Sequence, residues 1–101
     1  MASHRIETYC QRLAFPIGAL IFSRGINRLV NAGRLDPIPY FRRHTRGDWG
    51  DVTPQQWEAN SSALESGAPL ESHYLIHPGL AIRIITDAGR SVTAIVLPSE
   101  D

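Results

Sequence analysis

The last third of the chain alternates between apolar and polar residues with the two-residue period of β-strands. This period predicts three consecutive antiparallel strands over residues 72–77, 80–87 and 91–97, with Gly89 closing the second hairpin. Alternation assigns one set of residues to a single face: Tyr74, Ile76, Leu80, Ile82, Ile84, Val92, Ala94 and Val96. The other face receives Leu75, Ile85, Ile95 and Leu97. Because both faces are apolar, we expect the sheet to need two covers, supplied by helices or by a second copy of the chain.

The first half of the chain shows the spacing of short helices. Residues 4–13 and 24–32 carry apolar positions at helical spacing. Between them, residues 18–22 form a short apolar run that is typical of a buried strand. Asp36-Pro37 then opens another short helix.

The clearest helix is predicted to begin at Pro54 and to end near Ser66. Thr53 can accept a hydrogen bond as N-cap, and Gln56 completes a capping box with it. Proline suits the first helical position, and Gly67 can adopt the left-handed conformation that ends a helix. The 3.6-residue spacing places four residues on one face of this helix: Trp57, Asn60, Ser61 and Leu64.

These elements predict an α+β fold. A C-terminal three- to four-stranded antiparallel sheet is expected to pack with three or four short helices. The length of 101 residues fits one small domain, which we place at residues 17–98. An N-terminal extension of residues 1–16, with the helical pattern described above, precedes the domain, and a tail of residues 99–101 follows it.

The stretch from residue 44 to residue 60 holds both tryptophans and the sequence Gly-Asp-Trp-Gly-Asp. Aspartate and asparagine beside glycine are typical of turns, because their short side chains bond to nearby backbone groups. Both tryptophans are expected to anchor the core. His44 lies on the apolar face of the helix that Asp36-Pro37 opens, and it is expected to be a buried, hydrogen-bonded residue. The residues assigned to this structural motif are His44, Gly47, Asp48, Trp49, Gly50, Asp51, Trp57 and Asn60.

The formal net charge of zero conceals an asymmetry along the chain. Residues 1–46 hold eight arginines against two acids, whereas residues 47–101 hold eight acids against two arginines. If folding keeps these charges on separate faces, the domain is suited to steering a charged partner. The cluster Arg42, Arg43 and Arg46 is the predicted partner-binding patch. Its target is expected to be a protein, because the domain lacks the high isoelectric point and interleaved aromatic residues of nucleic-acid binders.

Several kinds of site are excluded or disfavoured. The single cysteine, Cys10, rules out an internal disulfide and a multi-cysteine metal site. His73 and His77 would lie roughly 13 Å apart on a strand, which is too far to share a metal ion. We therefore expect no metal and no cofactor. No apolar run approaches the length of a membrane span, so a cytoplasmic location is the expectation.

Catalytic signatures are also weak. Ser61, His44 and Asp48 could be drawn as a triad, but the Gly-x-Ser-x-Gly context of such a nucleophile is missing. The alternative that stays open is a small enzyme or nucleic-acid-processing protein. Its polar cluster would consist of His44, Asp48, Asp51 and Asn60.

The chain resembles a family of small uncharacterised bacterial proteins that are plasmid-related or carried by mobile elements. The resemblance covers about residues 17–98, and its most specific part is the pattern Arg-His-x-x-Gly-Asp-Trp-Gly-Asp from residue 43 to residue 51. Near the second predicted hairpin, family members usually carry an acidic residue at one of two positions, where this chain has Ala88 and Gly89. The resemblance implies a genetic context rather than a mechanism, because no activity is established for the family.

Two hypotheses follow for the function. The favoured one is a non-catalytic accessory protein of a mobile element that acts by protein–protein interaction. Its partner would be a host complex, for example a CRISPR or restriction nuclease that the protein inhibits. The chain is also a candidate homodimer. The alternative is the small enzyme described above; internal pairing of all the polar groups in the motif would favour the first hypothesis, and an open cleft with unpaired groups would favour the second.

Overall fold

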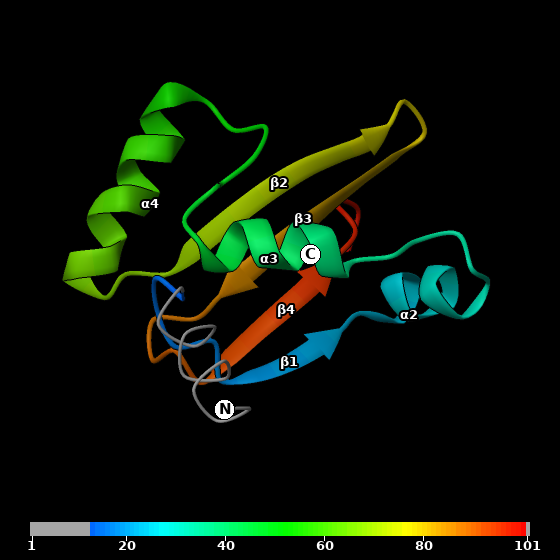
Figure 1. Ribbon diagram of the computed structural model, residues 1–101, viewed down its shortest axis with the longest axis horizontal. Helices are drawn as coiled ribbons and strands as arrows, with labels where there is room; N and C mark the ends of the chain where they lie inside the picture. The colour runs from blue at the N-terminus through cyan, green and yellow to red at the C-terminus, as the bar shows by residue number, and fades with distance from the viewer. Residues whose placement is uncertain (1–12, 101) are drawn as a thin grey trace, which may run out of the picture.

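A computed structural model describes residues 13–100, and these form an α+β domain (Figure 1). Three helices and four strands follow one another in the order β1 (Ala19–Phe22), α2 (Arg24–Asn31), α3 (Ile38–Thr45), α4 (Pro54–Ser66), β2 (Leu70–His77), β3 (Leu80–Thr86) and β4 (Val92–Val96). The α+β class and the three C-terminal strands are confirmed. The helix expected at residues 4–13 lies outside the described residues, apart from its last position.

The sheet is mixed rather than antiparallel, with the strand order β1-β4-β3-β2. β2, β3 and β4 pair as an antiparallel meander, as the sequence indicates. β1 instead pairs parallel to β4, with Ala19 opposite Val92 and Phe22 opposite Ile95. The expectation of a purely antiparallel sheet is therefore wrong. In the sequence, α2, α3, α4 and two strands lie between β1 and β4. The connecting chain is therefore long enough for the crossover that a parallel pair requires.

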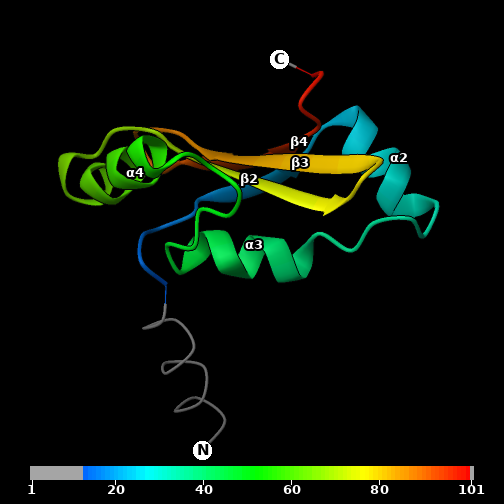
Figure 2. The same ribbon diagram turned by 90° about the horizontal axis from the view of Figure 1, so that it is seen from above.

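The helices cover only one face of the sheet. Figure 2 shows α3 lying across this covered face, while α4 lies beside the β2 edge and α2 lies beyond the strand ends. Within residues 13–100, no helix lies on the opposite, open face. The covered face carries Leu70, Ser72, Tyr74, Ile82, Ile84, Thr86, Thr93 and Ile95, all of them buried. The open face carries Ala19, Ile21, Glu71, His73, Leu75, Ala81, Arg83, Ile85, Val92, Ala94 and Val96.

The assignment of β4 to the two faces was reversed in the sequence-based prediction. Thr93 and Ile95 point into the core, whereas Val92, Ala94 and Val96 lie on the open face. The turn after β3 sets this register, because Asp87 accepts hydrogen bonds from the N–H groups of residues 91 and 92. The turn thereby places Thr93 opposite Thr86.

Two further expectations about burial are wrong. Trp57 is 40% exposed, because α4 lies beside the sheet edge and buries only Asn60 and Ala63. The run at residues 18–22 does form a strand, but it is an edge strand and not a buried one. Ile21 is 50% exposed as a result.

Trp49 behaves as predicted and is fully buried. It belongs to a small second core with Phe15, Ala63 and Leu70, and its indole N–H donates to the Ser61 hydroxyl on α4. Phe15, which the sequence places in the N-terminal extension, is thus part of the packed domain.

We predict opposite outcomes for the two tryptophans. Trp49→Ala should lower the free energy of unfolding by about 3–5 kcal/mol, because it leaves a large cavity in the second core. Trp57→Ala should lower it by clearly less, because that side chain is 40% exposed and its removal leaves no enclosed cavity. Urea unfolding followed by circular dichroism measures both values. Equal losses for the two variants would contradict the packing described here.

Candidate functional site

The Gly-Asp-Trp-Gly-Asp loop seals the outer edge of β2. The N–H of His73 donates to the carbonyl of Trp49 over 3.1 Å, and the N–H of Asp51 donates to the carbonyl of His73 over 2.6 Å. The Asp51 carboxylate also accepts from the N–H of Leu75 over 2.8 Å. Gly50 has a φ of 76°, and a Cβ at this position would lie 2.2 Å from the His73 carbonyl oxygen. Glycine is therefore required here by both conformation and space.

Asp48 holds the start of this loop. Its carboxylate accepts from the Arg43 guanidinium, with the shorter contact at 2.8 Å, and from the N–H of Gly50. The bond from Arg43 holds the pKa of Asp48 below its usual value. The Tyr74 hydroxyl donates to the Asp48 carbonyl, and Arg43 lies over the Tyr74 ring. Arg43, which the sequence places in the partner-binding patch, is thus engaged inside the molecule.

Asn60 fastens α4 to the same edge. Its side-chain carbonyl accepts from the N–H of Glu71, and its NH₂ group donates to the carbonyl of Glu71. The amide therefore pairs with β2 as a neighbouring strand would. A buried amide needs such partners, and this position supplies both.

His44 is fully buried between α3 and the sheet. One ring nitrogen, Nδ1, bonds to the Ser72 hydroxyl, and the other, Nε2, bonds to the Thr86 hydroxyl. The Thr86 hydroxyl bonds in turn to Thr93 over 2.8 Å, and Thr93 donates to the carbonyl of Ile17. We call this chain of bonds the His44 network.

The direction of the His44 network fixes the state of the imidazole. Because Thr93 donates its only hydroxyl proton to a carbonyl, it must accept from Thr86. Thr86 then accepts from Nε2–H of His44, which leaves Nδ1 as the acceptor for Ser72. Burial, with a smaller contribution from the nearby charge of Arg90, lowers the pKa of His44 to about 4. The ring is therefore neutral near pH 7.

The four residues of the enzyme hypothesis do not converge. His44 bonds within its network, Asp48 to Arg43, Asp51 to β2, and Asn60 to the backbone of Glu71. Across residues 13–100, none of the four bonds to another, and every buried side-chain nitrogen or oxygen has a hydrogen-bond partner. The motif is a set of satisfied structural contacts.

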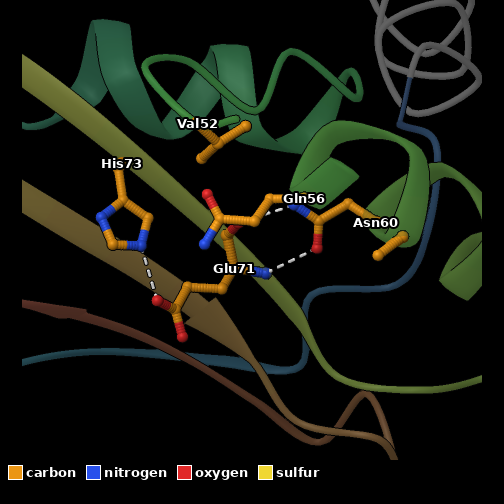
Figure 3. A pocket seen from close by; sticks show the side chains of 6 residues that line it. Val52, Gln56, Asn60, Glu71 and His73 are labelled. Carbon is orange, nitrogen blue, oxygen red and sulfur yellow. Dashed lines mark hydrogen bonds and ion pairs between the residues drawn. The ribbon is translucent and has the colours of Figure 1, made fainter. Parts of the chain in front are cut away.

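A hollow of about 200 Å³ lies between α4 and β2 (Figure 3). Sequence reasoning missed it, because His73 was weighed only against His77 as a metal pair. In this hollow His73 bonds to Glu71 over 2.6 Å, and Arg83 bonds to the same carboxylate over 3.1 Å. Burial raises the pKa of Glu71, but the bonds from Arg83 and His73 outweigh it and hold the pKa below its usual value.

The hollow contains the titratable side chains of Glu71 and His73 but no hydroxyl or thiol. Its lining consists of Val52, Gln56, Ala59, Asn60, Glu71 and His73, without serine, threonine or cysteine. Both carboxylate oxygens of Glu71 are already bonded. In the part of the chain that the structure describes, no three histidine, cysteine or acidic side chains gather to hold a metal ion. No described helix is long and apolar enough to cross a membrane.

Five arginine side chains on α2, on α3 with its C-cap, and on the segment that joins the two helices are exposed to solvent. Unlike that of Arg43, the guanidinium groups of these five arginines make no hydrogen bond or ion pair with the described residues. We call them the arginine surface: Arg24, Arg28, Arg34, Arg42 and Arg46. The exposed acids Glu58 and Glu65 lie on α4, which Figure 1 shows at the opposite end of the molecule from α2. The charge asymmetry of the sequence is kept only in part, because Glu100 accepts hydrogen bonds from Ser23 and from the N–H of Gly25 at the start of α2, and the exposed Asp36 lies between α2 and α3.

Comparison of this chain with protein-family models, curated proteins and solved structures found no match. The function is therefore inferred from the geometry of the molecule. That geometry separates a structural motif around His44 from an exposed set of unpaired cations.

The His44 network predicts a specific dependence of stability on pH. Between pH 6.5 and pH 4 the unfolded chain binds a proton on this histidine that the folded chain does not, so stability is lost as the pH falls through this window. The loss should reach about 3 kcal/mol, since one pKa unit corresponds to about 1.4 kcal/mol. His44→Gln removes the ionisation and should flatten the profile, whatever its stability at pH 7. Parallel unfolding profiles for the two proteins from pH 7 to pH 4.5 would show that His44 is not held neutral.

Proposed function

We propose that this chain is a non-catalytic binding protein that docks onto an acidic protein surface through its arginine surface. The observation that carries the proposal is the set of five exposed arginines whose guanidinium groups have no partner among residues 13–100. Guanidinium groups pair bidentately with carboxylates, and arginine is enriched in protein interfaces. A fold that satisfies its buried polar atoms while leaving these cations unpaired is suited to recognition rather than to catalysis.

The layout of the charges supports docking in a defined orientation. Arg24 and Arg28 lie on α2, at the opposite end of the molecule from α4 and its acids, and α3 with Arg42 lies between the two (Figure 1). Such a dipole orients the molecule as it approaches a charged partner and raises the association rate. Arg42 and Arg46 are the members of the predicted patch that remain available. Arg43 acts in the fold through Asp48.

The class of partner follows from the resemblance stated above and is part of the proposal. The protein would be an accessory protein of a mobile element, active in the bacterial cytoplasm. It would bind a host complex and inhibit it, with a restriction or CRISPR nuclease as the leading candidate. Self-association into a homodimer is a second, separate element of this proposal.

Neutralising two members of the arginine surface, Arg42 and Arg46, should strongly weaken partner binding without unfolding the protein. The test variant is Arg42→Gln with Arg46→Gln, and Arg43 is left in place because of its structural role. The matched control is Gln55→Glu with Ser62→Glu on the exposed side of α4, which changes the net charge by the same amount. Exposed charges contribute only about 0–1 kcal/mol each, so both variants should keep the stability of the natural protein.

Binding is measured by capture from lysates of the bacterial host, with mass spectrometry of the retained proteins. The natural chain and the α4 control should retain the same discrete complex, and the arginine variant should lose it. Raising the salt concentration should weaken the interaction, because it screens the charges. Plasmid transformation into cells that carry an active nuclease defence gives the functional readout. Equal capture and equal protection by all three proteins would refute the proposal.

A further inference from the structure

The two edges of the sheet differ in whether their outer backbone groups are paired. At the β2 edge, the loop at residues 49–51 pairs with His73, and Asp51 accepts from the N–H of Leu75. At the β1 edge, no described residue pairs with the outer side of the strand. The exposed run Ala-Leu-Ile-Phe contains no charge, no proline and no bulge, which are the usual means of protecting an edge.

The parallel ladder defines which backbone groups of β1 are free. The N–H of Ala19 donates to the carbonyl of Ser91, and the N–H of Ser23 donates to that of Ile95. In a parallel ladder the N–H and C=O groups of alternate residues point toward the neighbouring strand. The backbone groups of residues 19, 21 and 23 therefore face β4. The N–H and C=O groups of Leu20 and Phe22 consequently face outward. Among residues 13–100, these two residues therefore present four backbone groups without a partner at this edge.

We propose that a second copy of this chain occupies the β1 edge, with the two β1 strands antiparallel about a two-fold axis at Ile21. In this register Leu20 of one copy lies opposite Phe22 of the other. Opposed residues of such a pair exchange both of their hydrogen bonds, so all four outward groups of each strand are satisfied. Four backbone hydrogen bonds form, and the two sheets join into one of eight strands. The proposal deepens the homodimer element of the proposed function by naming its surface.

The side chains of β1 favour self-pairing over a charged partner. Ile21 is 50% exposed on the open face and would meet its own copy across the axis, where opposed side chains of a non-hydrogen-bonded pair are close. Leu20, which is 36% exposed, would gain cover on the opposite side of the joined sheet. No charged residue lies within β1, so two copies meet there without repulsion. The apolar open faces become continuous across the joint.

The size of this contact sets the expected strength. A four-residue edge buries less than the roughly 800 Å² per partner of a standard stable interface. We therefore expect a dissociation constant on the order of 0.1 mM, and a dimer that forms and dissociates with concentration. This dimer is independent of the arginine surface, so a failure of partner capture and a failure of self-association are separate results.

Amide hydrogen exchange of the unmutated 101-residue chain tests the proposal directly. The amides of Leu20 and Phe22 should exchange about fourfold more slowly at roughly 1 mM than at roughly 10 µM, because most of the chain is then dimeric. The amides of Ala19 and Ile21 bond to β4 and should be protected equally at both concentrations. Sedimentation velocity over the same range should show a shift from monomer to dimer. A chain that stays monomeric at 1 mM would overturn the proposal, whatever else covers the edge.

Three variants distinguish this edge from the open face. Leu20→Pro removes one outward N–H without removing a bond to β4, and proline is tolerated at such positions of an edge strand. It should abolish the dimer, whereas the matched control Leu20→Ala should keep it. Leu75→Glu places a charge on the open face at the far edge of the sheet, where Leu75 is 61% exposed, and should leave the dimer unchanged. Loss of the dimer in Leu75→Glu with retention in Leu20→Pro would mean that the sheets stack face to face, and would overturn the edge pairing.

Discussion

The burial of His44 is the constraint on which the rest of the structure depends. An imidazole without solvent contact must be neutral and must have a partner for each nitrogen. The covered face supplies these partners as hydroxyls: Ser72 from β2, Thr86 from β3 and, one bond further, Thr93 from β4. The last hydroxyl donates to the carbonyl of Ile17, just before β1. One side chain of α3 is thus linked through hydrogen bonds to three strands and to the entry of the fourth.

The conspicuous Gly-Asp-Trp-Gly-Asp motif has its explanation in the same region. The rings of Phe15 and Trp49 pack against His44 with centroid separations of 5.3 and 5.6 Å, and these aromatic contacts shield the His44 network from water. The loop that carries Trp49 then closes the β2 edge. A motif that reads like a reactive cluster in the sequence is therefore a clamp in the fold. The two proposed binding surfaces lie elsewhere, on the arginine surface and on the β1 edge.

Local signals were predicted well from the sequence, and long-range ones were not. The bounds of α4 follow from Thr53, Gln56 and Gly67, because capping depends on residues within one helical turn. The two-residue period identified the meander, but it could not orient β4, because the core accepts Thr93 only once Thr86 and Ile17 are beside it. Polarity alone places threonine outside.

Position relative to the sheet was the other unpredictable quantity. The amphipathic spacing that marked Trp57 as core assumes that α4 covers a sheet face, whereas the helix lies beside an edge. For the same reason an apolar run was taken as a buried strand when it is the bare edge at Ile21. The Glu71–His73 pair in the hollow also arises from tertiary arrangement: the two side chains are neighbours on one face of β2, and Arg83 reaches them from β3. The i, i+2 spacing of Glu71 and His73 on a predicted strand already places both side chains on one face.

The most direct test of this account is the state of the His44 imidazole in solution. Nitrogen-15 NMR of the histidine side chains distinguishes the two neutral tautomers and the charged ring by the chemical shifts of Nδ1 and Nε2. The account predicts a single neutral form of His44 protonated at Nε2, unchanged from pH 7.5 down to about pH 5, because its pKa is lowered to about 4. A ring that titrates near its ordinary pKa of about 6.5, or one protonated at Nδ1, would contradict the hydrogen-bond chain on which the account depends.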